Sequence, residues 1–288
     1  MDLGAFDERV KPLGVLGYIV TRDGEEIASE RFDEECRRNV YSASKSFTSA
    51  AVGLAEKEGL LDLEERIVDA FREDLPDRIV GYWEEARVRD LLTMCLGQEK
   101  AALMGGQRVF IPENDWVKLS LSIPLVTHPG EKFVYNNVGP YLAGVLVQRR
   151  AGCDLVSYLA PRLFGKLGIR RPTWETDPLG YTFGAGGLFL ALSELHKLGI
   201  LYRDRGVFGG VRILPEDWVR ESVKAHDDPG YGYLFWRGEH DSFRADGKYG
   251  QLSIVFPEKN AVVTIAAECR DTPSLFRAVY DILYPEIP

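Results

Sequence analysis

The sequence is poor in the residues that form metal centres and disulfide frameworks. It contains four histidines and four cysteines, and none of them has the spacing typical of zinc ligands or of a redox motif. We therefore expect no metal and no cofactor. We interpret the cysteines as buried thiols in a reducing compartment, because they lie far apart, at Cys36, Cys95, Cys153 and Cys269.

The sequence also lacks long apolar runs and an excess of basic residues. No run reaches the roughly 18 apolar residues of a membrane span, and the first residues do not form the apolar core of a signal peptide. We therefore expect a cytoplasmic protein with no membrane partner. Lys and Arg number 35 against 44 Asp and Glu, for a formal net charge of -9. This acidic balance argues against nucleic acid as a partner.

What is present is a chain of 288 residues, 45% hydrophobic, which is enough for one large domain or two closely packed ones. Alternating apolar residues predict strands at both ends of the chain. The stretch "GVLGYIVTRDGEEIASERF" predicts a hairpin that turns at Asp23-Gly24. Further strands are expected over residues 231–240, 250–256 and 261–268, followed by an amphipathic helix over 272–284.

Helical spacing of apolar residues dominates the middle of the chain. We expect helices over residues 42–58, 84–98, 138–152 and 186–204. Because strands occur at both ends, we predict an α+β fold in which an antiparallel sheet is flanked by helices and an all-helical lobe is inserted. The predicted sheet lobe comprises residues 1–60 and 185–288, and the predicted helical lobe comprises residues 61–184. A cleft between the two lobes is the expected site.

The stretch "VYSASKSFTSA", residues 40–50, contains the first sign of chemistry. A serine hydroxyl is a weak nucleophile unless a base lies within hydrogen-bond reach. Residues three apart share one face of a helix, and among these serines Ser42 alone has a lysine, Lys45, at that spacing. The start of a helix also offers free N–H groups that favour an oxyanion. The pattern therefore indicates Ser42 as a nucleophile.

The role of Lys45 has two interpretations. To accept a proton, its amine must be partly neutral, which burial or a neighbouring positive charge promotes. Alternatively, Lys45 stays charged and lowers the pKa of a third group. A Ser-x-x-Lys pair alone is common and usually consists of a cap and a solvated lysine. Here the helix that follows is apolar on most of its surface, which favours a buried Lys45.

Longer stretches carry a family resemblance. "YSASKSFTSAAVGLAEKEGLLDLEERI" resembles the active-site helix of the serine β-lactamase-like superfamily, which includes class C β-lactamases, penicillin-binding DD-peptidases, esterases and 6-aminohexanoate-dimer hydrolases. "PLVTHPGEKFVYNNVGPYLAG" resembles its Tyr-x-Asn segment and puts Tyr135 and Asn137 at those positions. "ARVRDLLTMCLG" resembles a helix in which Met94 replaces the usual histidine, which we interpret as a packing change. The resemblance runs from about Gly14 to about Glu268.

The third family motif is altered. It usually reads Lys-Thr-Gly or His-x-Gly, and here the best alignment gives Ala245-Asp246-Gly247. The resemblance assigns the usual cation to the substrate carboxylate, so its loss argues against β-lactam and peptide-carboxylate recognition. The remaining pattern resembles the aminohexanoate-hydrolase and esterase branch. Arg244 and Lys248 are the candidate replacement cations.

The resemblance implies a role for each site residue. Ser42 would be the nucleophile, and Lys45 the proton acceptor or the group that tunes one. Tyr135 would share the proton relay, as a phenolate stabilised by Lys45. Asn137 would hold Lys45 or the substrate. The backbone N–H groups of Ser42 and of Lys248, just after Gly247, would form the oxyanion hole.

These observations predict a serine hydrolase that forms an acyl-enzyme on a small ester or amide. A β-lactamase or DD-peptidase is the first alternative, and a catalytically degenerate binding or sensor protein is the second. A Ser-His-Asp triad is disfavoured because no Gly-x-Ser-x-Gly elbow occurs. A nucleotide loop at "GAGGLF" is disfavoured because the glycine spacing is wrong. Oligomeric state is left open.

Overall fold

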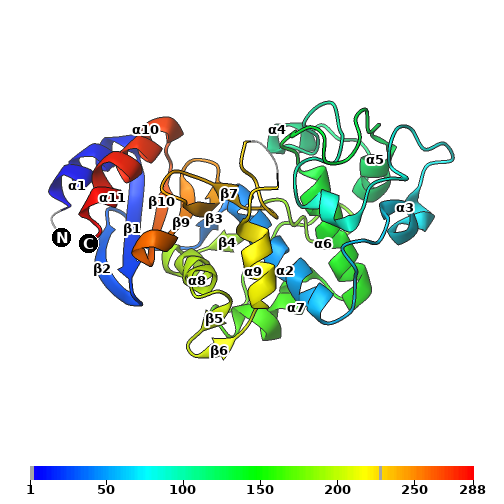
Figure 1. Cartoon of the computed structure of the whole chain (residues 1–288). Coiled ribbons are helices and arrows are strands. Elements are labelled where there is room, and N and C mark those ends of the chain that lie inside the picture. Colours follow the sequence, from blue (N-terminus) through cyan, green and yellow to red (C-terminus); the bar gives the residue numbers. More distant parts are fainter. Residues whose placement is uncertain (1–2, 227–228) are drawn as a thin grey trace.

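The computed structural model describes residues 3–226 and 229–288, and its centre is a six-stranded antiparallel sheet in the order β2-β1-β10-β9-β8-β7 (Figure 1). Both ends of the chain contribute strands, because β1 pairs with β10 and places Tyr18 opposite Ile265. The α+β prediction is confirmed. The strands are β1 (Val15–Arg22), β2 (Glu25–Arg31), β7 (Trp236–Arg237), β8 (Phe243–Gly247), β9 (Gln251–Phe256) and β10 (Ala261–Ala267).

The predicted first hairpin is present, and its turn has the expected backbone. Asp23 and Gly24 have φ values of 52° and 89°, the left-handed pair that matches the twist of a two-residue hairpin. Strand β9 is buried at every position, whereas β2 at the sheet edge is largely exposed and charged. A fully buried strand requires cover on both faces of the sheet.

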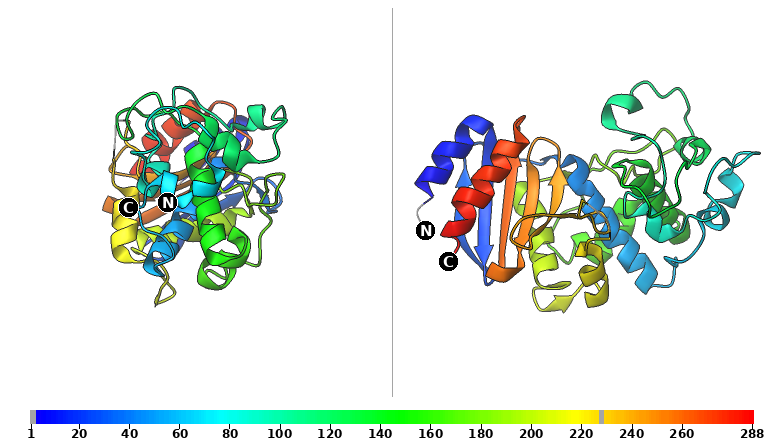
Figure 2. Two further views of the ribbon diagram at one scale, coloured as in Figure 1. Left: turned by 90° about the vertical axis from the view of Figure 1, so that its right-hand side faces the viewer. Right: turned by 45° about the horizontal axis from the view of Figure 1, so that its top comes forward.

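Helices supply that cover. One face carries α1 (Gly4–Val10) and the C-terminal run of α10 (Thr272–Arg277), the π-helix η7 (Ala278–Leu283) and α11 (Tyr284–Glu286), as Figure 2 shows. The other face carries α8 (Leu192–Arg203). The sequence analysis missed α1, since this short helix buries only Phe6 and Val10 and has too few apolar positions to show a period.

The remaining helices lie beyond the β7 edge of the sheet (Figure 1). The central one is α2 (Ser44–Lys57), buried from Ser44 to Ala55 and packed against α6 (Val138–Ala151). The predicted end of this helix at Gly59, whose φ is 70°, is confirmed. The others are α3 (Ile67–Ala70), α4 (Gly105–Arg108), α5 (Trp116–Ser122), α7 (Leu155–Leu159), η5 (Ala160–Phe164) and α9 (Glu216–Val223). The proposed residue limits of the two lobes stay a prediction.

The prediction of a helix over residues 84–98 is wrong. Only the 3₁₀-helix η4 (Val88–Leu91) forms there, and Met94 has a left-handed φ of 64°. The carbonyl of Leu92 accepts from the N–H of Leu234 at 3.0 Å instead of continuing a helix. Tertiary hydrogen bonds therefore override the apolar spacing that suggested a helix.

Two further boundaries differ from prediction. The strand expected over 231–240 is reduced to β7, because Leu234, with φ 65°, turns the chain before it. The helix expected over 186–204 begins at Leu192, because β4 (Phe189–Leu190) pairs with β3 (Arg38–Asn39). A second small sheet joins β5 (Val207–Phe208) to β6 (Val211–Arg212).

The prediction that the cysteines are buried holds only in part. Cys95 and Cys269 are buried, Cys153 is half-buried and Cys36 is exposed. Among the helices within residues 3–226 and 229–288, none has the length and apolar character needed to cross a bilayer.

Candidate active site

Ser42 lies in a tight turn directly before α2. The turn is the 3₁₀-helix η2 (Tyr41–Ala43), and Tyr41 has a left-handed φ of 46°, which is rare for a bulky residue. Side chains hold this conformation, since the Tyr41 N–H donates to Asn39 Oδ1 at 2.7 Å and Ser44 Oγ donates to the Tyr41 carbonyl at 2.5 Å. The strained turn leaves Ser42 partly exposed at the mouth of the helix.

Lys45 lies one helical turn later and is 1% exposed. Its Nζ atom donates to Asn137 Oδ1 at 2.7 Å and to the carbonyl of Ala185 at 2.6 Å, and it lies 3.1 Å from Ser42 Oγ, within hydrogen-bond distance. All three partners are uncharged. Burial, assisted by the positive charge of Arg108, lowers the pKa of Lys45 to about 7. A large part of the lysine is therefore neutral at neutral pH.

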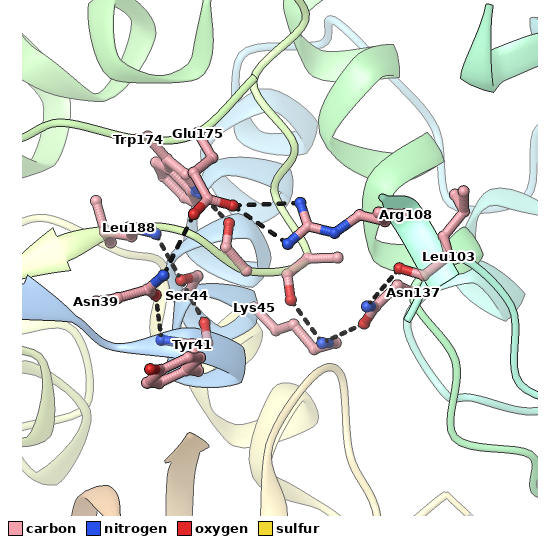
Figure 3. Close-up of polar contacts among 12 residues, drawn as sticks. Asn39, Tyr41, Ser44, Lys45, Leu103, Arg108, Asn137, Trp174, Glu175 and Leu188 are labelled. Carbon is pink, nitrogen blue, oxygen red and sulfur yellow. Dashed lines mark hydrogen bonds and ion pairs between the residues drawn. The ribbon is translucent and has the colours of Figure 1, made fainter. Parts of the chain in front are cut away.

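Asn137 is the residue immediately before α6, and its side chain orients the Lys45 amine. Its side-chain amide donates to the carbonyl of Leu103 at 2.9 Å, and its backbone N–H donates to the carbonyl of Ala102 at 3.1 Å. Because the side-chain nitrogen Nδ2 is bound to the Leu103 carbonyl, the oxygen Oδ1 is presented to the Lys45 amine (Figure 3).

Tyr135 approaches the same pair from the loop before α6. Its phenol is a hydrogen-bond partner of Ser42, and its ring centroid lies 5.0 Å from Lys45 Nζ. The ring stacks on Trp236 of β7 at 5.6 Å. Burial raises the pKa of the Tyr135 phenol, the Asp246 carboxylate raises it further, and the bond to Ser42 offsets only part of this. The phenol is therefore protonated at neutral pH.

Strand β8 ends beside the η2 turn that contains Ser42. A Cβ atom on Gly247 would lie 2.2 Å from the carbonyl oxygen of Val40, so only glycine allows this close approach. Ala245, in place of the usual cation, is 1% exposed. Arg244 donates to Asp246 at 2.8 Å and to the carbonyl of Arg237 at 2.9 Å. Of the two candidate cations, it is Lys248 that lines the cleft.

The cleft itself is a cavity of about 520 Å³. It extends from Ser42 and Asn137 to the loop that contains Gly186. Its far wall contains an ion pair in which both terminal nitrogens of Arg108, from α4, lie 3.2 Å from Glu175 Oε2. The cleft therefore contains Ser42, whose hydroxyl contacts the buried Lys45 amine, and a fixed charge pair.

A family model described as Beta-lactamase matches residues 5–283. The chain belongs to the beta-lactamase family. Membership indicates a hydrolase.

Particular relatives share parts or all of the fold. A segment of 115 residues, 38% of this chain, is 28% identical to a 6-aminohexanoate-dimer hydrolase of Paenarthrobacter ureafaciens, and covers 29% of that curated relative. The structure of an octameric penicillin-binding protein homologue from Pyrococcus abyssi matches with a TM-score of 0.81 at 19% sequence identity. The match covers 99% of this chain and 77% of the homologue's chain. The structure of a hydrolase with promiscuous acyltransferase activity matches with a TM-score of 0.74 at 15% sequence identity. The match covers 96% of this chain and 98% of that hydrolase's chain. The likeness to these structures shows the β-lactamase-like fold.

The histidines of this family member are engaged elsewhere. His196 lies between Thr264 and Thr21, at 2.7 Å and 3.2 Å, and His128 pairs with Glu85. His226 and His240 stack on tyrosine rings. Within the described residues, no histidine contact reaches Ser42, so the geometry offers no support for a Ser-His-Asp triad.

Arg108 and Glu175 are the site residues that the sequence analysis missed. They lie 67 positions apart, and neither belongs to a motif of the family. The adjacent glycines Gly105 and Gly106 indicate a loop, but they carry no information on where its arginine points. Only the folded chain brings this pair to the cleft (Figure 3).

Proposed function

We propose that this protein is a serine hydrolase in which Ser42 attacks the carbonyl carbon of a small ester or amide and forms an acyl-enzyme. The observation that carries the proposal is the 3.1 Å contact between Lys45 Nζ and Ser42 Oγ. The amine is buried, and in the part of the chain that the structure describes its hydrogen bonds go to uncharged acceptors. A lysine without a carboxylate partner is suited to accept a proton.

The sequence left open whether Lys45 or Tyr135 is the base, and the pKa directions favour Lys45. The Lys45 amine loses its proton near neutrality, whereas the raised pKa of Tyr135 keeps the phenol protonated. We therefore assign proton acceptance to Lys45. Tyr135, a partner of Ser42, then passes its proton towards the leaving group, and the ammonium of Lys45 returns a proton to Tyr135.

The reaction has two halves. First, Ser42 Oγ forms a bond to the carbonyl carbon, its proton moves to Lys45, and the leaving group departs with a proton from the relay. Water then attacks the acyl-enzyme, gives its proton to Lys45, and the serine oxygen leaves with the proton returned. Each half regenerates the neutral amine, so no external base is needed.

The oxyanion of each intermediate requires two N–H donors. We propose the backbone N–H groups of Ser42 and Lys248, as the sequence suggested. The close packing of Gly247 on Val40 supports this assignment, because it holds the end of β8 against the nucleophile turn. Loss of one such donor typically costs about 2.7–4 kcal/mol of transition-state stabilisation.

The preferred substrate class follows from the third motif. Ala245 offers no cation, and Arg244 is already bound to Asp246. A substrate whose recognition depends on a cation at that position is therefore disfavoured, and we propose small esters and amides ahead of β-lactams or peptide carboxylates.

The test uses a short-chain nitrophenyl ester for turnover and a fluorophosphonate for labelling, followed by intact and peptide mass spectrometry. The proposal predicts ester hydrolysis and one phosphonyl adduct per chain, located on Ser42 and missing in Ser42→Ala. Wild-type protein that neither turns over acyl donors nor takes up the label would support the binding or sensor alternative instead.

A further inference from the structure

The backbone around Tyr135 is anchored on both sides by Met94. The N–H of Val134 donates to the Met94 carbonyl at 2.9 Å, and the N–H of Asn136 donates to Met94 Sδ at 3.5 Å. Met94 is 1% exposed, so both acceptors are presented from the protein interior. With its neighbours held in this way, the main freedom left to Tyr135 is rotation of its side chain about χ1 and χ2.

An indole ring restricts that rotation. Trp236 of β7 stacks on the Tyr135 ring, with the centroids 5.6 Å apart and an angle of 22° between the planes. Tyr231 meets the Tyr135 ring edge-on at 6.2 Å, and Lys45 Nζ lies 5.0 Å from its centroid. A change of χ1 that carries the phenol away from Ser42 therefore also separates the stacked rings.

The indole of Trp236 is itself fixed from several sides. Tyr231 and Phe133 meet it edge-on, with ring centroids at 4.8 Å and 5.6 Å. In the sheet, Trp236 pairs with Arg244 of β8, whose Cζ atom lies 5.9 Å from the indole centroid. Trp236 is half-buried at the edge of the sheet, yet these contacts give its ring a defined orientation against Tyr135.

We propose that Trp236 is a positioning residue of the reaction proposed above: its stack holds the Tyr135 phenol at Ser42, in the orientation that delivers a proton to the leaving group. This inference rests on the proposed function. A proton donor must lie within hydrogen-bond reach of the departing atom, and a well-placed donor contributes about 10²–10⁴-fold to the rate. The indole supplies neither charge nor proton, so it acts through the geometry of Tyr135.

The leaving group decides how much a substrate depends on this geometry. In acylation Ser42 Oγ bonds to the carbonyl carbon, its proton moves to Lys45, and the bond from that carbon to the leaving group breaks. A nitrophenolate departs as a stable anion. An alkoxide needs the proton of Tyr135, which Lys45 then restores. Two esters with the same acyl group, one nitrophenyl and one alkyl, therefore separate proton delivery from the attack of Ser42.

The experiment measures kcat/KM for these two esters and the rate of Ser42 labelling by a fluorophosphonate, from which fluoride leaves as an anion. Trp236→Leu should lower kcat/KM for the alkyl ester by about 10²-fold, and should lower the nitrophenyl ester and labelling rates by less than about fivefold. Trp236→Phe, which keeps a ring to stack on Tyr135, should recover most of the alkyl-ester activity.

A double-variant cycle tests whether Trp236 acts through Tyr135. Tyr135→Phe removes the proton that the stack is proposed to position. In that background Trp236→Leu should have little further effect on the alkyl ester, because coupled residues do not contribute additively. Losses that multiply in the double variant would overturn the inference, since the indole would then act by a separate route.

The matched control is Tyr284 of α11. Its ring is also half-buried and also stacked, on His240 at 3.8 Å, with Phe256 as a second ring neighbour at 4.9 Å. Tyr284→Leu therefore removes a stacked ring from the helical cover of the sheet and leaves the contacts of Tyr135 in place. It should retain the wild-type ratio of the two ester rates, and a selective loss on the alkyl ester in this variant would contradict the inference.

Other results decide between this inference and the proposed function. Equal losses on both esters in Trp236→Leu, loss of labelling in that variant, or a Trp236→Phe defect as large as that of Trp236→Leu would overturn the inference alone. Wild-type protein that is labelled but hydrolyses only the nitrophenyl ester would also overturn it, because no proton delivery would remain to be positioned. Wild-type protein that forms no Ser42 adduct would remove the proposed function, and this inference with it.

Discussion

Lys45 Nζ lies 3.1 Å from Ser42 Oγ and 2.7 Å from Asn137 Oδ1, so one buried amine bridges Ser42 in the η2 turn and the residue immediately before α6. Lys45 and Asn137 are 92 positions apart in the sequence. One side chain of α2 therefore connects the proposed nucleophile with the start of α6, the helix that packs against α2.

The first prediction concerns Ser42 and Lys45 as a unit. Ser42→Ala and Lys45→Ala should each lower kcat/KM for a nitrophenyl ester by about 10³-fold or more, and the double variant should be little worse than either. The reason is that the hydroxyl cannot react without its base, and the base has no function without the hydroxyl. Losses that multiply in the double variant would show that the two residues act separately.

The second prediction uses Asn137, whose amide can be exchanged for a carboxylate of the same shape. Asn137→Asp places a negative charge about where Oδ1 now accepts from Lys45, which favours the protonated amine and raises the pKa of Lys45. Activity at neutral pH should fall and should recover at higher pH. Asn137→Ala, which removes the acceptor without adding charge, should lower activity with no such recovery. Equal pH profiles for the two variants would contradict the prediction.

The third prediction concerns stability and follows from the same pKa. The folded pKa of Lys45 is lowered from 10.5 to about 7, so the unfolded chain binds more protons between these values. The folded state therefore loses stability as pH falls from about 10 to about 7, by at most roughly 5 kcal/mol. Lys45→Met, which cannot titrate, should lack this dependence.

Urea unfolding at several pH values measures the effect. The difference in unfolding free energy between Lys45→Met and wild type should change in favour of the variant as the pH is lowered through this window. A difference that stays constant with pH would mean that the buried amine does not titrate there. Comparing differences at each pH cancels the contributions of the other titrating groups.

The fourth prediction concerns Gly247. Gly247→Ala places a Cβ atom 2.2 Å from the Val40 carbonyl, so the end of β8 must move away from the nucleophile turn. We expect a stability loss of about 1–3 kcal/mol and a fall in kcat larger than the change in KM, because the oxyanion donor after Gly247 is displaced. A variant with normal kcat would argue against an oxyanion donor at Lys248.

The fifth prediction concerns β-lactams. A chromogenic cephalosporin should be hydrolysed at least about 10²-fold less efficiently than the ester, because Ala245 replaces the cation and Arg244 is bound to Asp246. Rapid cephalosporin hydrolysis would overturn this substrate assignment and would leave the Ser42 mechanism intact.

Local patterns explain which parts of the molecule could be predicted from sequence. The Ser42–Lys45 pairing depends on a spacing within one helical turn, and the Asp23-Gly24 hairpin depends on a turn with left-handed backbone. Both are determined by a few adjacent residues, so both could be predicted from the sequence. The resemblance to the family motifs also predicted Tyr135 as a site residue, and the fold brings it to Ser42.

The features that could not be predicted depend on distant partners. Residues 84–98 have helical spacing, but the Leu92 carbonyl is used by Leu234, which lies far along the chain. The Arg108–Glu175 pair belongs to no motif and forms only when α4 reaches the cleft. In both cases a tertiary contact decides the outcome, and a local pattern cannot report it.

The most direct test of the account is the pH dependence of Ser42 phosphonylation in wild type and in Lys45→Ala. The account predicts a wild-type rate that rises to a plateau through a midpoint near pH 7, and very slow labelling without that rise in the variant. Labelling of Ser42 as fast in Lys45→Ala as in wild type, or a wild-type rate independent of pH, would contradict the claim that the buried lysine is the base.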